Sequence, residues 1–205
     1  MKTKVSTLLL LLLTLTSLSF SQNENLYTNN IGACITFYGV YLDASGEPIG
    51  YSTGTGFFIG NSSDGIFCTA YHVVKGANEV LIDYGYTSGT IPNDFINLTQ
   101  IYPIETSKRY YWIDESRDLI VFKMPGLKPS KTLSLNTNLP SQGETIHTIG
   151  NTFGDYTMKL SSGQTSQIMQ GNLMKWIISE FTGLGGGNSG GPVFNKSGDV
   201  VGLVD

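Results

Sequence analysis

The chain has 205 residues, of which 14% are charged, and 16 acidic against 12 basic residues give a net charge of −4. A nucleic-acid-binding protein is expected to carry a clustered basic surface. Here the densest basic grouping, Lys108, Arg109 and Arg117, is diluted by Asp114 and Glu115, so we expect no nucleic-acid partner. The length suffices for one domain or for two small barrels that share an interface.

The first 21 residues predict a secretory signal peptide. A basic tip at Lys2 and Lys4 precedes an apolar stretch centred on Leu8 to Leu13, which is the pattern of an export signal. Threonines and serines interrupt the stretch before it reaches the roughly 20 apolar residues that a spanning helix needs. We therefore expect cleavage after Ser21, a secreted or periplasmic protein, and no stable membrane anchor once the signal is removed. An uncleaved anchor is the less favoured alternative.

Residues 22–124 are predicted to form an N-terminal β-barrel. The chain holds 25 glycines, and short runs rich in Val, Ile, Thr, Tyr and Phe alternate with Gly, Asn, Ser and Asp, which is typical of all-β proteins. A short helical turn is expected at Tyr71 to Gly76. Six strands are predicted, at Ala33 to Leu42, Thr55 to Ile59, Ile66 to Thr69, Glu79 to Tyr84, within Thr99 to Trp112, and at Leu119 to Lys123.

A segment with proline, glycine and lysine at 125–133 is predicted to connect the two halves. Residues 134–205 would form a C-terminal β-barrel, since two similar sets of short strands are compatible with two barrels. The candidate strands of this half are Glu144 to Ile149, Thr165 to Gln170, Leu173 to Ser179, Pro192 to Phe194 and Val200 to Val204.

A glycine-rich segment, GGGNSGGPV at Gly185 to Val193, surrounds a single serine. Acyl transfer needs an exposed hydroxyl and two backbone N–H groups aimed at the oxyanion of a tetrahedral intermediate, and neighbouring side chains would obstruct the substrate. We interpret Ser189 as the nucleophile and the N–H groups of Gly187 and Ser189 as the oxyanion hole. A glycine-rich hairpin turn is the alternative interpretation of this segment.

Two further residues complete a candidate catalytic triad. His72 begins the predicted helical turn after a strand, and its imidazole can accept the serine proton at neutral pH. Asp118 stands directly before the apolar run at 119–122, so it can lie buried at a strand start and orient the imidazole. Asp114 and Glu115 lie in a more polar stretch and are less favoured alternatives. We expect the second histidine, His147, to be structural.

Five segments in chain order resemble those of trypsin-like serine peptidases, most of all the bacterial Deg/HtrA-type protease domain. They are GTGFFI at Gly54 to Ile59, CTAYHVV at Cys68 to Val74, DLIVFK at Asp118 to Lys123, IGNTFG at Ile149 to Gly154 and GNSGGPV at Gly187 to Val193. The order His, Asp, Ser is the one this fold uses. The resemblance implies two antiparallel six-stranded barrels of chymotrypsin type, with His72 and Asp118 on the first, Ser189 on the second, and the active site in the cleft between them.

The resemblance also implies an activity. A serine endopeptidase would hydrolyse polypeptide substrates through an acyl-enzyme on Ser189, without a cofactor or metal ion. Asn188 stands where many zymogens carry an aspartate that binds a newly cut N-terminus, so we expect activity without propeptide cleavage. A non-catalytic secreted binding module on the same scaffold is the alternative. An esterase is less favoured because no GxSxG elbow is present.

Two departures from the family pattern concern the second barrel. Gly183, Leu184, Gly185 and Gly186 replace the proline and alanines expected along the specificity pocket. Gly183 would lie at the base of this pocket and has no acidic side chain to bind an Arg or Lys of the substrate. We therefore expect a small or apolar side chain at the cleaved bond. Few residues follow Ser189, whereas the family continues through a last strand, so the second barrel is expected to be incomplete.

The two cysteines, Cys34 and Cys68, allow one disulfide, which an oxidising compartment would permit. A whole predicted strand lies between the two predicted strands that contain Cys34 and Cys68. A disulfide would therefore require the two side chains to meet inside the barrel. Two buried free thiols are the alternative.

Overall fold

The computed structural model describes residues 23–83, 94–97, 111–123, 129–154, 157–172 and 174–205. The predicted signal peptide and its cleavage point lie outside these residues, as does the first part of the predicted connector. Within the described residues, no helix is long and apolar enough to cross a membrane.

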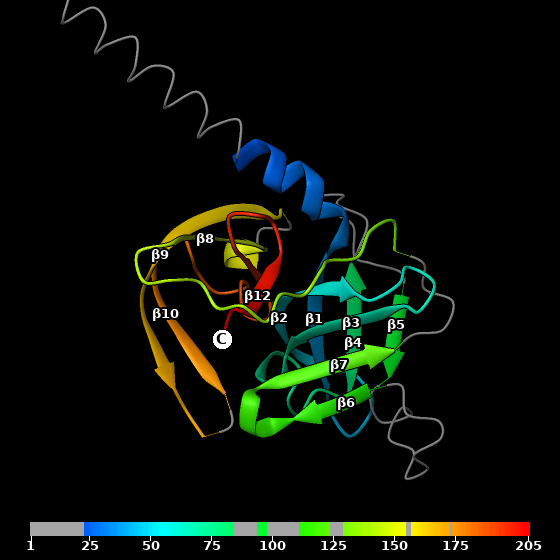
Figure 1. Cartoon of the computed structure of the whole chain (residues 1–205). Coiled ribbons are helices and arrows are strands. Elements are labelled where there is room, and N and C mark those ends of the chain that lie inside the picture. Colours follow the sequence, from blue (N-terminus) through cyan, green and yellow to red (C-terminus); the bar gives the residue numbers. More distant parts are fainter. Residues whose placement is uncertain (1–22, 84–93, 98–110, 124–128, 155–156, 173) are drawn as a thin grey trace, which may run out of the picture.

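The first half of the chain folds into one antiparallel sheet of seven strands (Figure 1). They are β1 (Cys34–Leu42), β2 (Pro48–Ile59), β3 (Ile66–Ala70), β4 (Glu79–Asp83), β5 (Asp94–Asn97), β6 (Tyr111–Asp114) and β7 (Leu119–Lys123). Their spatial order is β5-β4-β1-β2-β3-β7-β6. One described strand, β5, was not predicted, because it has only two apolar residues between Asp94 and Asn97, too few to suggest a strand. Most of the predicted strand within Thr99 to Trp112 lies outside the described residues.

The second half forms a five-stranded antiparallel sheet. Its strands are β8 (Thr145–Gly150), β9 (Lys159–Gln170), β10 (Lys175–Thr182), β11 (Pro192–Phe194) and β12 (Val200–Leu203). Their order is β10-β9-β8-β11-β12, so β10 and β12 are edges that do not pair and the sheet is open between them. The predicted all-β class, with an incomplete second barrel, is therefore confirmed.

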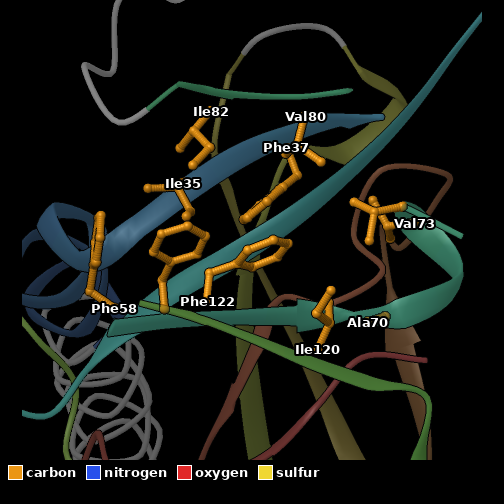
Figure 2. Packing of buried hydrophobic residues seen from close by; sticks show 11 residues of the cluster. Ile35, Phe37, Phe58, Ala70, Val73, Val80, Ile82, Ile120 and Phe122 are labelled. Atoms are coloured by element: carbon orange, nitrogen blue, oxygen red, sulfur yellow. The ribbon is translucent and has the colours of Figure 1, made fainter. Parts of the chain in front are cut away.

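An aromatic core fills the interior of the first sheet (Figure 2). Phe67 stacks on Phe122 with ring centroids 5.0 Å apart, and Phe37 lies 5.4 Å from Phe67. Aromatic pairs at these distances stabilise a core beyond the area they bury. The other buried members of this cluster are Ile35, Phe58, Ala70, Val73, Val74, Val80, Ile82 and Ile120.

A second buried cluster joins the two sheets. Successive residues of a strand point to opposite faces, so Phe58 enters the aromatic core while Phe57, its neighbour, enters the second cluster. There Phe57 packs with residues of the second sheet, including Ile149 and Phe194. This cluster holds the sheets against each other and so fixes the relative position of the groups that each contributes to a site.

The cysteines are two buried free thiols, not a disulfide. Phe57 of β2 pairs with Cys34 of β1 on one side and with Cys68 of β3 on the other, so a complete strand separates them. Burial raises the pKa of both thiols, that of Cys68 to about 12. Since the thiolate is the reactive form, neither cysteine is a nucleophile at neutral pH.

Some element bounds differ from prediction. Residues 23–30 form a helix that was not predicted, because Leu26 and Tyr27 are the only large apolar side chains among its polar residues. Tyr27 fixes it by donating a hydrogen bond of 2.8 Å to the carbonyl of Met158. Strand β2 begins at Pro48, seven residues earlier than predicted, since its proline, glycines and serine are poor strand formers.

Candidate active site

His72 lies in a single helical turn, η2 (Tyr71–Val73), directly after β3. Two contacts hold this turn in place. The N–H of Tyr71 donates to the carbonyl of Asp118 at 2.9 Å, and Val73 and Val74 are buried in the aromatic core. The imidazole itself remains 48% exposed. The sequence TAYHVV therefore folds into an anchored turn that presents His72 at the surface.

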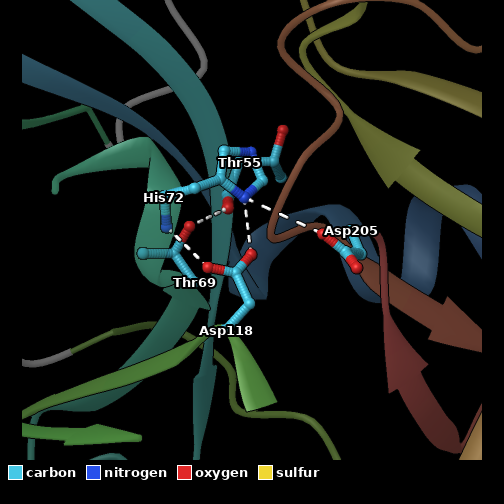
Figure 3. Close-up of polar contacts among 5 residues, drawn as sticks. All are labelled: Thr55, Thr69, His72, Asp118 and Asp205. Atoms are coloured by element: carbon cyan, nitrogen blue, oxygen red, sulfur yellow. Dashed lines mark hydrogen bonds and ion pairs between the residues drawn. The ribbon is translucent and has the colours of Figure 1, made fainter. Parts of the chain in front are cut away.

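Asp118 makes two hydrogen bonds to His72 (Figure 3). Its Oδ1 accepts from the backbone N–H of His72 at 2.8 Å, and its Oδ2 lies 2.5 Å from the imidazole Nδ1. A carboxylate is an acceptor only, so Nδ1 must carry the proton and Nε2 is left as the basic nitrogen. Asp118 has a positive φ of 47°, a conformation that Asp tolerates better than most residues.

The alternative carboxylates have other partners. Asp114 accepts from the hydroxyl of Ser116 at 2.6 Å and from the backbone N–H of Arg117 at 3.2 Å, and it also pairs with the Arg117 guanidinium. The hydrogen bond from Ser116 and the bonds and charge of Arg117 hold the pKa of Asp114 below its usual value. Glu115 pairs with Lys75 at 3.6 Å. Of the three acidic candidates, Asp118 alone has His72 as its hydrogen-bond partner.

Ser189 lies in a loop of the second half that is pressed against the first sheet. The backbone N–H of Thr55 in β2 donates to the carbonyl of Ser189 at 2.8 Å. Gly190 has a φ of +81°, and a Cβ there would lie 2.1 Å from Thr69 Oγ1 and 2.3 Å from the Thr55 carbonyl oxygen. Only glycine allows this approach. Thr69 lies three residues before His72, so the loop meets the strand end that carries the imidazole.

Among the described contacts, Ser189 Oγ makes no hydrogen bond to His72. Catalytic hydrogen bonds are often long or poorly aligned before substrate binds. The backbone N–H groups of Gly187 and Ser189, predicted as the oxyanion hole, likewise donate to none of the described groups.

Thr55 links the loop of Gly187 to the loop that follows β8. Its hydroxyl donates to the Gly187 carbonyl at 2.6 Å and accepts from the backbone N–H of Asn151 at 2.9 Å. Gly187 has a φ of +97°, and a Cβ there would lie 2.1 Å from the Asn151 carbonyl oxygen. The sequence interpretation gave Thr55 no role, although it stands within the GTGFFI segment that was singled out.

Asn188 is buried and has partners of its own. Its amide Nδ2 donates to Thr152 Oγ1 and to the carbonyl of Gly185, both at 3.0 Å. Nearby, the N–H of Phe153 donates to the carbonyl of Gly186 at 2.5 Å. Phe153 has a φ of 63° and is 74% exposed. The glycine-rich stretch before Ser189 is thus tied to the loop after β8.

A cavity of about 410 Å³ opens between β10 and β12 beside the site. Of the four residues predicted to line a specificity pocket, Leu184 lies in its wall and Gly183, Gly185 and Gly186 do not. Asp205 lies at the same cavity, and its Oδ1 is 3.9 Å from His72 Nδ1. The remaining wall is largely apolar and includes Trp176, Phe181, Val193, Val201 and Leu203.

His147 lines a different cavity, of about 690 Å³, beside the helix at 23–30. Its Nδ1 lies 2.8 Å from Ser162 Oγ, and burial lowers its pKa. The neutral form is therefore favoured at neutral pH. This arrangement agrees with a structural histidine.

His72, Asp118 and Asp205 form a group of potential metal ligands whose nearest atoms lie within 4.8 Å of one another. The Nδ1 to Oδ2 distance of 2.5 Å between His72 and Asp118 is that of a short hydrogen bond. Two ligands of one zinc ion, each about 2 Å from the metal in a tetrahedral site, lie roughly 3 Å or more apart. The spacing fits a hydrogen bond better than two ligands of one metal ion.

Residues 54–203 match the family model described as the trypsin-like peptidase domain. A probable periplasmic DegP-like serine endoprotease of Hahella chejuensis is 31% identical over 175 residues, which cover 82% of this chain and 32% of that protein. The magnetosome formation protease MamE of Paramagnetospirillum magneticum is 31% identical over 155 residues, covering 73% of this chain and 19% of that protein. The chain thus spans about a third or less of the length of these relatives.

Solved structures show the same fold. An HtrA-type protease with a tripeptide superposes with a TM-score of 0.63 at 19% identity, covering 88% of this chain and 53% of the other. The serine endoprotease from Yersinia pestis gives a TM-score of 0.57 at 18% identity, covering 88% of this chain and 56% of the other. At these identities the likeness concerns the fold alone.

Proposed function

Since this chain belongs to the trypsin-like peptidase family, we propose that it is a serine endopeptidase that hydrolyses peptide bonds through an acyl-enzyme on Ser189. The observation that carries the proposal is the pair of hydrogen bonds from His72 to Asp118, which leaves Nε2 of the imidazole as the base. The Ser189 loop meets the strand that carries His72, at Thr69. A binding module would need neither feature.

In the proposed reaction, His72 Nε2 accepts the proton of Ser189 Oγ as the oxygen attacks the substrate carbonyl carbon. The N–H groups of Gly187 and Ser189 donate to the oxyanion of the tetrahedral intermediate. His72 then gives its proton to the leaving amine, and the carbon–nitrogen bond breaks. A water molecule, deprotonated by His72, attacks the acyl-enzyme and releases the acid and the free Ser189 hydroxyl.

We further propose that activity requires no newly cut N-terminus. The neutral amide of Asn188 already bonds to Thr152 and to Gly185, so the loop before Ser189 is held without an ion pair. Purified protein that begins at Gln22 should therefore be active. Protein that becomes active only after a further cut would contradict this.

The proposed substrates are polypeptides outside the cytoplasm. The predicted signal peptide supports export, and DegP-like relatives are named as periplasmic endoproteases. The largely apolar wall of the cavity that contains Leu184 supports an apolar side chain at the cleaved bond.

Parallel assays on casein and on a short-chain ester would test the proposed function. We expect wild-type protein to hydrolyse casein and the Ser189→Ala variant to show background hydrolysis only, because no other described group replaces the nucleophile. Equal casein hydrolysis by both proteins would reject Ser189 as the nucleophile. Turnover of the ester without casein would indicate an esterase, and no turnover of either would indicate a binding module.

A further inference from the structure

Two carboxylates, not one, face the imidazole of His72 (Figure 3). Asp118 Oδ2 lies 2.5 Å from Nδ1, and Asp205 Oδ1 lies 3.9 Å from the same nitrogen. We propose that Asp205 is a positioning residue for the reaction at Ser189: its negative charge stabilises the imidazolium that forms when His72 takes the serine proton. This inference rests on the proposed function.

The two carboxylates reach His72 from different sheets. Asp118 precedes β7 of the first sheet, whereas Asp205 follows β12 of the second. The strand end before Asp205 is fixed to the nucleophile loop, because Val204 N–H donates to the Gly191 carbonyl at 2.9 Å and Gly190 N–H donates to the Val204 carbonyl at 2.6 Å. The backbone that carries Asp205 is therefore held beside the loop that carries Ser189.

The charge of Asp205 has no second described role. Within the described residues, its carboxylate makes no hydrogen bond, and its charged contact is with His72. Two basic groups of the first half near the site pair with other acids: Lys75 pairs with Glu115, and Arg117 pairs with Asp114. Removing the Asp205 charge should therefore leave the fold intact and act on the reaction.

The size of the effect follows from distance and exposure. The Asp205 side chain is 49% exposed and that of His72 is 48% exposed, so water and salt screen the attraction between them. A charge about 4 Å away in such surroundings changes a rate about fivefold. Asp118, which is closer, less exposed and hydrogen bonded, should have a much larger effect.

The test compares wild type, Asp205→Asn, Asp205→Glu and Glu180→Gln with a peptide substrate at low and at high salt. Glu180 is the matched control, because it is an exposed acid on β10 of the same sheet. Its neighbours Ser179 and Phe181 line the cavity beside the site, so Glu180 faces away from it. At low salt we expect kcat of Asp205→Asn to fall about fivefold with KM unchanged. Asp205→Glu should retain most of kcat, and Glu180→Gln should match wild type.

Raising the salt to about 1 M should shrink the ratio of wild-type to Asp205→Asn kcat toward one, since the screening length falls to about 3 Å. An unchanged kcat for Asp205→Asn at low salt would overturn the inference. If kcat of Asp205→Asn fell equally at both salt concentrations, or if KM rose while kcat stayed the same, Asp205 would act through structure or substrate binding instead. A wild-type protein with no Ser189-dependent activity would reject the proposed function, and this inference with it.

Discussion

Replacing Asp118 with Asn is expected to lower kcat about 10⁴-fold without unfolding the protein. Asp118 presents acceptors to two donors of His72, the backbone N–H and Nδ1–H. Asn has one carbonyl oxygen, so if that oxygen keeps the backbone bond, the amide NH₂ faces Nδ1. The imidazole must then accept at Nδ1 and carry its proton on Nε2, where it cannot act as a base.

Asp114→Asn is the matched control, because it removes an acid of the same turn whose partners are Ser116 and Arg117. We expect its kcat/KM to stay within about twofold of wild type, since Asn keeps a side-chain oxygen that can accept from Ser116 and from the Arg117 N–H. Both variants should be measured with a peptide substrate, and their thermal unfolding compared. Equal activity losses in the two variants would mean that the turn, not the Asp118 carboxylate, supports the reaction.

Gly190→Ala is expected to lower kcat/KM by about 10²-fold or more. The added Cβ would lie 2.1 Å from Thr69 Oγ1, 2.3 Å from the Thr55 carbonyl oxygen and 2.5 Å from the Ala70 nitrogen. Two of these atoms are backbone atoms of the first sheet, so the loop that carries Ser189 must move instead. The clash and the positive φ together should also lower the free energy of unfolding by about 2 kcal/mol or more.

The Gly143→Ala variant separates the effect of the positive φ from the effect of the clash at Gly190. Gly143 has a φ of +79°, close to that of Gly190, but a Cβ there would meet nothing within 4 Å. This control should be destabilised by about 1 kcal/mol through backbone strain alone and should keep its activity. Activity would be measured with a peptide substrate and stability by denaturant unfolding. A Gly190→Ala protein as active as Gly143→Ala would show that the close approach at Gly190 does not position the nucleophile.

The sequence was sufficient to predict the all-β class and the pairing of His72 with Asp118. The apolar run after Asp118 and the strand before His72 are continuous enough to predict, and the observed strands β3 and β7 pair directly. No described contact tests the catalytic roles of His72, Asp118 and Ser189, so these roles stay predictions. The structure adds that the two strands place the Asp118 carboxylate within hydrogen-bond distance of the His72 imidazole.

Other features depend on contacts between distant residues, which no local pattern reports. The helix at 23–30 is polar in sequence and is held by the bond from Tyr27 to Met158, 131 residues away. Asp205 reaches His72 only because Val204 pairs with the loop around Gly190. Neither contact can be predicted from the composition of the sequence, from the spacing of its motifs or from the alternation of apolar and polar residues.

The free thiols show a further limit of sequence patterns. Strand β1, strand β3 and the end of β2 around Phe57 are buried on both faces, one in the aromatic core and one against the second sheet, so apolar and polar residues do not alternate there. The side that each cysteine faces therefore could not be read from its neighbours. The register settles it, because Phe57 stands between Cys34 and Cys68.

The central claim is that His72 activates Ser189 as a nucleophile, and a fluorophosphonate probe followed by peptide mass mapping tests it most directly. We predict one adduct per molecule on Ser189 in the wild-type protein, and labelling reduced to background in Ser189→Ala and His72→Ala. Equal labelling of wild type and Ser189→Ala, or an adduct on another residue, would contradict the claim.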